Sequence, residues 1–201
     1  MPSELSDIAI VLLAAGQSSR MQGKDKLAEL VDGVPCLRVM ALRALEVSQH
    51  VVVTLPDLSH TRAGVLQDLA LNRVAVPNAC EGMSASLKTG ISVLRQRAAM
   101  ILPADMPGIT SAGLAQITKA HKDGRITRAT DTAGTPGHPV IFDCSYFPDL
   151  DALEGDEGAR IVLKQHADQV DMVTAQGFDP LTDLDTQNDW AAWRKHQAAQ
   201  K

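Results

Sequence analysis

The first 122 residues alternate between continuous apolar runs and segments that space apolar side chains as helices do. The continuous runs have the length and composition of buried strands, and they cover 8–13, 50–55, 73–76 and 98–102. The other segments place apolar residues three and four positions apart, and they cover 37–45, 65–69, 83–94 and 114–120. This alternation predicts an α/β protein with a Rossmann-like three-layer α/β/α architecture and a mostly parallel sheet.

The rhythm changes after about residue 122. Three short segments, 126–130, 133–137 and 139–142, predict a hairpin-like excursion in the C-terminal half. We then expect two short helices, a late strand and a terminal helix, over 146–153, 158–166, 170–174 and 187–199. A chain of 201 residues suits a single domain, 1–201, with a substantial core.

Composition narrows the class of protein. The net charge of −5 argues against nucleic acid or an anionic membrane surface as the main partner. No apolar run approaches the ~18 residues of a membrane span, and the first ten residues lack a signal peptide's basic start. We therefore expect a cytoplasmic protein. Cys36, Cys80 and Cys144 form no C-x-x-C pair, so they predict small buried hydrophobes rather than a zinc site or a disulfide.

Hydrogen-bond donors and cations crowd the loop after the first strand. They are Gly16, Ser18, Ser19, Arg20, Lys24 and Lys26. This set predicts a site for an anion with several negative groups, such as a polyphosphate. The loop is neither a dinucleotide fingerprint, because Ser18 replaces the second glycine, nor a P-loop, because six residues separate Gly16 from Gly23. The plain alternative is a surface loop with solvated charges.

Two more polar segments follow predicted strands, and the carboxyl ends of parallel strands share one edge of a sheet. Ser84 and Ser86 lie near a helix start, where free N–H groups favour an anion, although Ser84 could simply cap the helix. Asp105 follows the strand 98–102 and offers a hard oxygen ligand for Mg²⁺. Its alternative role is to cap the next helix, but Thr110 can do so instead.

A last acidic segment, TDLDTQND, precedes the terminal helix. Asp183 and Asp185 are spaced like a phosphatase D-x-D pair, but Gln187 and the location late in the chain do not fit that motif. Thr186 and Asp189 are spaced as a variant of the capping box for the terminal helix. Such a cap would also hold Asp185 in place.

The stretch LAAGQSSRMQGKDKL resembles the signature L-A-[AG]-G-x-S-x-R-M-x-G-x-x-K of the MobA-like NTP transferases. The matching residues are Leu13, Ala14, Ala15, Gly16, Ser18, Arg20, Met21, Gly23 and Lys26. Gln22 is a departure, because many members of the family have glycine directly after the methionine. The resemblance implies the nucleotide-diphospho-sugar transferase type of fold. It also implies a nucleotide-binding half, about 1–122, and an acceptor-binding half, about 123–201.

Five further motifs resemble the family. E-G-M-S-x-S-L-x-x-G implies that Gly82, Ser84 and Ser86 contact the nucleoside, and L-P-A-D-M-P implies that Asp105 binds the metal. D-L-D-T-x-x-D implies Asp185 as a second metal ligand. G-H-P-V and G-D-E-G-A-R imply acceptor-binding residues, which are His138, Gly158 and Arg160, although His138 could equally be structural.

The resemblance implies a nucleotidyltransferase that uses Mg²⁺, with Mn²⁺ as an alternative ion. An acceptor phosphate would attack the α-phosphorus of a nucleoside triphosphate, and pyrophosphate would leave. Catalytic roles fall on Arg20, Lys26 and Asp105. Nucleotide contacts fall on Leu13, Ala14, Ala15, Gly16, Ser18, Ser19, Arg20 and Lys26, with the residues of the second motif.

Ala15 resembles the cytidylyltransferase (MocA-type) form of the first motif, L-A-A-G. This implies CTP as substrate and a molybdopterin-type cofactor as acceptor, in the service of a molybdenum hydroxylase or its maturation chaperone. The alternatives are GTP, a different phosphorylated acceptor, or a non-catalytic cofactor carrier. A dinucleotide-binding oxidoreductase would require the missing glycines.

Overall fold

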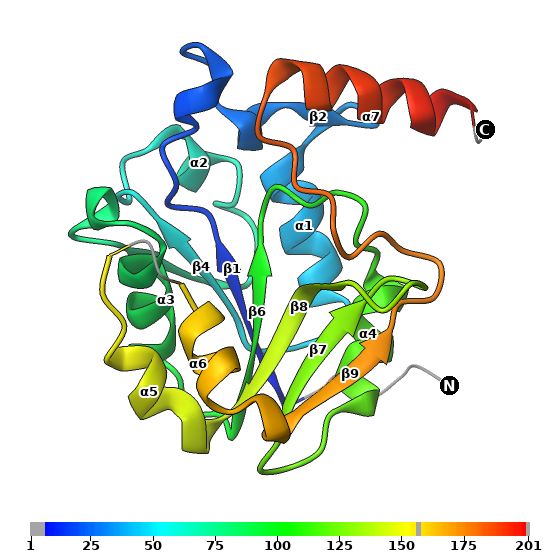
Figure 1. Ribbon diagram of the computed structural model, residues 1–201. Helices are drawn as coiled ribbons and strands as arrows, with labels where there is room; N and C mark the ends of the chain where they lie inside the picture. The colour runs from blue at the N-terminus through cyan, green and yellow to red at the C-terminus, as the bar shows by residue number, and fades with distance from the viewer. Residues whose placement is uncertain (1–6, 156–157, 200–201) are drawn as a thin grey trace.

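A seven-stranded sheet with the strand order β5-β4-β1-β6-β8-β7-β9 forms the centre of the computed structural model, which describes residues 7–155 and 158–199 (Figure 1). The strands are β1 (Ala9–Leu13), β4 (Val51–Leu55), β5 (Asn72–Ala75), β6 (Ala98–Pro103), β7 (Ile126–Thr130), β8 (Pro136–Asp143) and β9 (Val170–Thr174). All neighbours pair in parallel except β8, which is antiparallel to both β6 and β7. A small hairpin of β2 (Leu30–Val31) and β3 (Val34–Pro35) stands apart.

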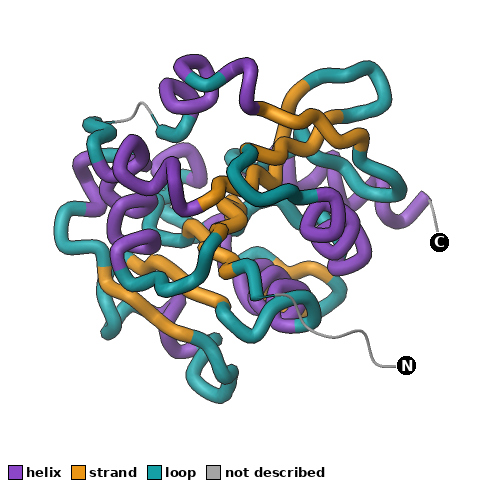
Figure 2. Tube along the Cα trace, turned by 90° about the horizontal axis from the view of Figure 1, so that it is seen from below, coloured by secondary structure: helices purple, strands orange, loops and turns teal. Residues whose placement is uncertain are grey.

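Helices cover both faces of the sheet. Behind it in Figure 1 lie α1 (Cys36–Leu45) and α4 (Ser111–Ala120). In front of it lie α3 (Met83–Ser92), α5 (Phe147–Asp151) and α6 (Arg160–Gln165). Two more helices, α2 (Thr61–Gly64) and α7 (Gln187–Ala199), lie at the edge where the parallel strands end. Figure 2 shows the same layers from below, with helices on both sides of the strands.

Side chains of β1 divide between two hydrophobic cores. Ile10 and Leu12 face the cluster under α1 and α4, whereas Val11 faces the cluster under α3, α5 and α6. Helix α3 packs closely against β1: a Cβ atom at Gly90 on α3 would lie only 2.4 Å from Val11 Cγ1. Burial on both faces explains why β1 is a continuous apolar run rather than an alternating one.

The predicted three-layer fold is confirmed, and the two predicted segments 133–137 and 139–142 fall on one strand, β8, which begins only at Pro136. A predicted helix over 65–69 is wrong. The backbone there makes turns closed by hydrogen bonds between residues three apart, such as Leu69 N–H to the Leu66 carbonyl. Helix α2 lies earlier in the chain. Leu66 is nevertheless fully buried, so its apolar spacing reflects core packing in a turn.

The prediction for the cysteines holds only in part. Cys36 is buried under α1, but Cys80 and Cys144 are exposed, because each lies in a short 3₁₀ turn after a strand. Within the described residues, no helix has the length and apolar character needed to cross a membrane.

Candidate functional site

A cavity of about 420 Å³ opens where β1 and β6 end. Most of the residues predicted to bind nucleotide or metal line it together: Leu13, Ala14, Ala15, Gly16, Ser18, Ser19, Arg20, Lys26, Gly82, Ser86, Asp105 and Asp185. We call it the first cavity. Segments far apart in the sequence therefore meet at one edge of the sheet, as the topology requires.

The loop after β1, residues 14–18, presents backbone donors to this cavity. No described residue accepts a hydrogen bond from the N–H groups of Ala15, Gly16 or Gln17. Ser18 has a φ of 53°, in the left-handed region, and its hydroxyl accepts from Lys26 N–H at 3.2 Å. Unpaired amides on such a loop suit an anionic ligand.

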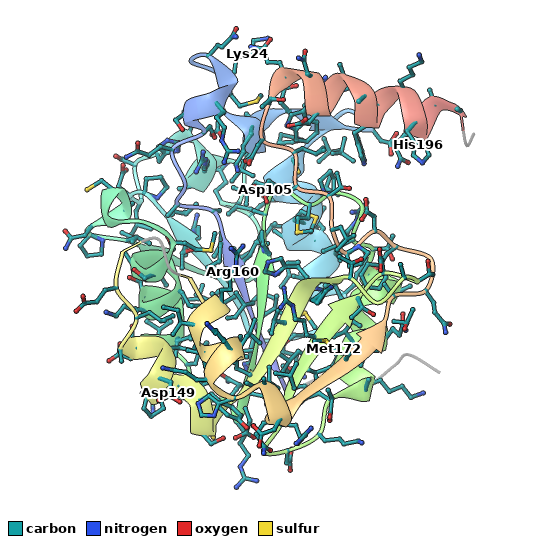
Figure 3. The ribbon with its side chains drawn as sticks, in the orientation of Figure 1. Lys24, Asp105, Asp149, Arg160, Met172 and His196 are labelled. Atoms are coloured by element: carbon teal, nitrogen blue, oxygen red, sulfur yellow. The ribbon has the colours of Figure 1, made fainter. Side chains whose placement is uncertain are left out.

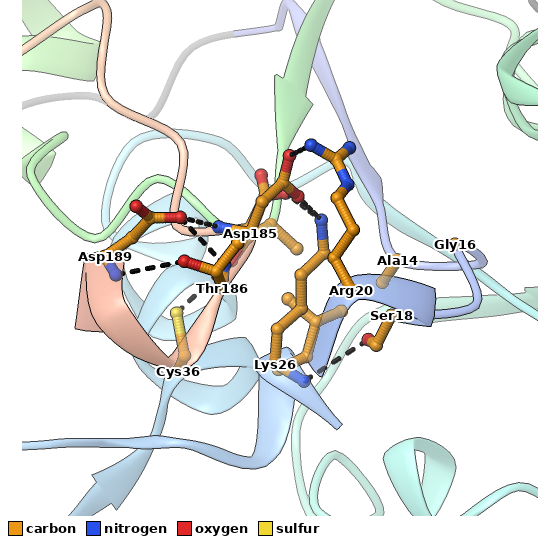
Figure 4. A network of polar contacts seen from close by, with 12 residues as sticks. Ala14, Gly16, Ser18, Arg20, Lys26, Cys36, Asp185, Thr186 and Asp189 are labelled. Carbon is orange, nitrogen blue, oxygen red and sulfur yellow. Dashed lines mark hydrogen bonds and ion pairs between the residues drawn. The ribbon is translucent and has the colours of Figure 1, made fainter. Parts of the chain in front are cut away.

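Cations and carboxylates form a network of ion pairs in the first cavity (Figure 4). The Lys26 ammonium lies between Asp105 Oδ2 and Asp185 Oδ1, with 2.6 Å to the latter atom. Arg20 also pairs with Asp185, at 2.7 Å. Burial would lower the pKa of Lys26, but the two carboxylates outweigh this effect and raise the pKa above its usual value. Lys26 is therefore a fixed positive charge between the two aspartates.

A third carboxylate, that of Asp183, completes an acidic group that the sequence did not assign as a ligand set. Ligand atoms of Asp105, Asp183 and Asp185 lie within 4.8 Å of one another. Burial, with the charges of Asp185 and Asp105, raises the pKa of Asp183. Asp105 Oδ1 is buried and has no hydrogen-bond partner among the described residues. Hard oxygen donors with one orphaned atom fit a divalent cation such as Mg²⁺ or Mn²⁺.

The acidic segment is held by backbone and capping contacts. Leu184 is buried between the two aspartates, and its N–H donates to the Asp105 carbonyl at 3.0 Å. The predicted capping box is confirmed: Thr186 N–H donates to Asp189 Oδ2 at 2.8 Å, and Asp189 N–H donates to Thr186 Oγ1 at 3.2 Å. Because Thr110 caps α4, accepting from Gly113 N–H, the Asp105 carboxylate is not needed as a cap.

Ser84 departs from its predicted place. Its hydroxyl donates to the Gly155 carbonyl at 2.6 Å, so it ties α3 to the segment before α6 and does not line the first cavity. The cap residue of α3 is Gly82, which bonds through no side chain, so the alternative role of Ser84 as a cap is wrong. Gly82 instead turns the chain with a φ of 107°.

A second cavity, of about 530 Å³, lies beside the first on the α6 face of the sheet. It contains all three predicted acceptor residues, His138, Gly158 and Arg160. Figure 3 shows Arg160 on α6 in front of the sheet, below Asp105 at the upper end of β6. Leu13 and Met83 line both cavities, so the two spaces adjoin. Asp156 and Glu157, in the middle of the predicted acceptor motif, lie outside the described residues.

The second cavity combines an apolar floor with cations. Its floor includes Leu87, Ile101, Val140 and Phe142, and its charged residues are Arg128, Arg160 and Lys164. Among the described residues, none of these three cations has an acidic partner. Sequence reasoning missed Arg128 and Lys164, because a cation on a strand or helix carries no local sign of the direction in which it points.

His138 is a neutral polar group in this second cavity. Burial, helped by the positive charge of Arg128, lowers the pKa of His138 to about 4. Its Nδ1 atom is buried and has no partner among the described residues. At neutral pH the ring therefore carries no charge.

A three-layer α/β/α sheet that carries an amide loop and a group of carboxylates at its strand ends suits a nucleotidyltransferase. The fold agrees with a crystal structure of a Mycobacterium tuberculosis H37Rv protein, with a TM-score of 0.78 and 22% identity over 94% of this chain and 99% of that chain. The mycobacterial protein has also been solved with manganese. The family model of the MobA-like NTP transferase domain matches residues 10–170. The chain belongs to this family and is a nucleotidyltransferase.

Two curated relatives have different names. A Natronomonas pharaonis protein named "probable molybdenum cofactor guanylyltransferase" is 36% identical over 98 residues, which are 48% of each chain. The match thus spans about half the length of that relative. A Paenarthrobacter nicotinovorans protein named "nicotine blue oxidoreductase" is 25% identical over 193 residues, which are 92% of this chain and 95% of that one.

Proposed function

We propose that this nucleotidyltransferase moves CMP from CTP onto the phosphate of a molybdopterin-type cofactor and releases pyrophosphate. The observation that carries the proposal is the meeting of two unlike cavities at Leu13 and Met83. One cavity has unpaired amides, cations and carboxylates, which suit a metal-bound triphosphate. The other has an apolar floor and cations that have no acidic partner among the described residues, which suits a flat heterocycle that carries a phosphate.

On the nucleotide side, the roles follow from charge. Asp105 and Asp185 would hold Mg²⁺ or Mn²⁺, and the ion supplies positive charge against the phosphates. Arg20 and Lys26 neutralise the triphosphate and the leaving pyrophosphate, and amides of the loop 14–18 bind phosphate oxygens. An anionic acceptor phosphate needs no protein nucleophile, so catalysis is positioning and charge neutralisation.

On the acceptor side, Arg160 binds the acceptor phosphate, together with Arg128 and Lys164. Gly158, with a φ of 57°, lets the backbone turn beside Met83, whose sulfur would lie 3.3 Å from a Cβ at that position. Neutral His138 exchanges a hydrogen bond with the polar edge of the acceptor. We expect the product to pass to a molybdenum hydroxylase or its maturation chaperone in the cytoplasm.

Ala15 favours CTP, whereas the name of the Natronomonas relative favours GTP. The test is pyrophosphate release by the purified protein with Mg²⁺ and molybdopterin cofactor, with CTP and GTP compared at equal concentration. Release with CTP alone supports the proposal. Release with GTP alone would assign the protein to the guanylyl branch, and nucleotide binding without release would indicate another acceptor or a carrier.

An oxidoreductase activity is the second candidate, and the full-length match to the Paenarthrobacter protein favours it. It would leave the cation site of Asp105 and Asp185 without a purpose, and the loop lacks the glycines of a dinucleotide fingerprint. Oxidation of a reduced nicotinamide cofactor with a quinone-like dye, unaffected by Asp105→Ala, would support this candidate.

A further inference from the structure

Arg62 lies behind the loop 14–18 that follows β1. It lines neither the first nor the second cavity and is not among the residues predicted for the site. It sits in the four-residue helix α2, after β4, and is only 5% exposed. Its Nη1 donates to the carbonyl oxygens of Ala14 at 2.6 Å and Gly16 at 2.7 Å. Both ends of the loop's first turn are therefore held from the rear by one nitrogen.

The other two nitrogens of the guanidinium bind the segment 18–25, which continues this loop. Nε and Nη2 donate to the two carboxylate oxygens of Asp25, each at 2.7 Å. Nη2 also donates to Ser18 Oγ at 3.1 Å. Asp25 in turn accepts from Leu27 N–H at 3.0 Å and starts the turn that carries Lys26. All five N–H donors of Arg62 are used, and one planar group joins Ala14 and Gly16 to Ser18 and Asp25.

Holding the carbonyls fixes the direction of the amides. Within a planar trans peptide, the C=O of one residue and the N–H of the next point in opposite directions. Arg62 holds the carbonyls of Ala14 and Gly16, so the N–H groups of Ala15 and Gln17 point away from it. Both of these residues line the first cavity, and no described residue accepts from their amides.

Arg62 also neutralises the negative charge of Asp25, which lies next to the loop 14–18. Burial would raise the pKa of Asp25, but hydrogen bonds from Arg62 and Leu27 outweigh it and lower the pKa. Asp25 is therefore ionised, next in sequence to Lys26. Without Arg62, its carboxylate would repel a triphosphate across the loop.

We propose that Arg62 is a positioning residue for the triphosphate: it turns the loop's amides into the first cavity and neutralises Asp25. This inference rests on the nucleotide part of the proposed function. It is independent of the choice between CTP and GTP and of the acceptor. Arg62 acts through the loop and does not touch the reacting atoms.

The experiment measures binding of inorganic triphosphate with Mg²⁺ by calorimetry, because this probe has neither base nor acceptor. We expect Arg62→Ala to weaken binding about tenfold or more, since small displacements of positioning groups are costly. Arg62→Lys keeps the charge but has three donors on one atom, so it recovers little. If Arg62→Ala does not fold, the binding of triphosphate is measured with Arg62→Lys instead.

The matched control is Arg38→Ala. Arg38 also forms a two-pronged pair, with Asp68, and also holds a carbonyl, that of Val65, but it lies outside both cavities. Its variant should bind triphosphate as the unchanged protein does. Adding millimolar guanidinium to Arg62→Ala should restore part of the lost affinity, which a general loss of structure would not allow.

The outcomes separate the two claims. Triphosphate binding by the unchanged protein and by both Arg62 variants with equal affinity would overturn the role of Arg62 alone. The same loss in Arg38→Ala would also overturn it, because the effect would then be general. If the unchanged protein does not bind triphosphate, the proposed nucleotide site fails and the inference fails with it.

Discussion

The two cavities handle charge in opposite ways. In the first, each charged group already has a partner within the protein: Lys26 pairs with Asp105 and Asp185, and Arg20 pairs with Asp185. In the second, Arg128, Arg160 and Lys164 have no acidic partner among the described residues. Under the proposed roles, the charged groups of the first cavity exchange partners when the nucleotide binds. In the second cavity, Arg128 donates to the carbonyls of Gly137 and Pro136, whereas Arg160 and Lys164 have no acidic partner to leave among the described residues.

The largest expected effect is at Asp105, on the paired side. Asp105→Ala removes the orphaned oxygen and one of the two carboxylates around Lys26, so turnover should fall by at least about a hundredfold. Pyrophosphate release with Mg²⁺ measures it. Asp68→Ala, which removes a surface aspartate from its pair with Arg38, is the control and should keep normal turnover. Normal Mg²⁺-dependent turnover in Asp105→Ala would refute the metal role.

Lys26 tests the exchange of partners directly. Its ammonium occupies the space between two carboxylates that would hold a cation, so Lys26→Met should tighten Mn²⁺ binding to the nucleotide-free protein by roughly tenfold. The same variant should turn over slowly. Electron paramagnetic resonance of free Mn²⁺ gives the affinity without any substrate. Unchanged or weaker Mn²⁺ binding would show that Lys26 does not compete for the site.

Arg160 tests the unpaired side. Arg160→Ala should raise the KM for the acceptor about tenfold and leave the KM for the nucleotide unchanged, because a charge-assisted contact to the acceptor phosphate is lost. Arg20→Ala should give the reverse pattern. Steady-state kinetics with each substrate varied in turn separates the two. The contrast between the cavities would be wrong if both variants changed the same KM.

The smallest effect concerns His138 and stability. Its folded pKa of about 4 lies below the unfolded value of 6.5, so the unfolded state binds more protons and stability is lost as pH falls through this range. Between about pH 7 and pH 5, the chain should lose roughly 1–2 kcal/mol that His138→Gln does not lose. Urea denaturation of both proteins at the two pH values measures this difference. Equal losses would mean that His138 is not held neutral by the fold.

Prediction from sequence succeeded where a signal is local. The strand 8–13, the capping box of Thr186 and Asp189, and the carboxylate after 98–102 each depend on neighbouring residues, and the structure has them as expected. Their convergence followed from parallel topology. The division into a nucleotide half and an acceptor half stays a prediction, as do the roles of the individual site residues.

The sequence failed where tertiary packing decides a side chain's partner. Arg62 lies in a four-residue helix without an apolar pattern, and nothing nearby reveals that it binds two carbonyls 46 and 48 positions earlier. Ser84 looked like a cap, but the Gly155 carbonyl lies within reach of its hydroxyl. An arginine or lysine in the loop after the second strand of a parallel sheet is the only sequence signal that could have drawn attention to Arg62.

We propose that the two cavities hold a nucleoside triphosphate and a phosphorylated pterin for one transfer reaction. The most direct measurement is transfer of label from CTP labelled at the α-phosphorus to the molybdopterin cofactor, with pyrophosphate counted in the same sample. We expect one labelled cofactor for each pyrophosphate, and loss of both in Asp105→Ala. Pyrophosphate release without label on the cofactor, or the same transfer in Asp105→Ala, would contradict it.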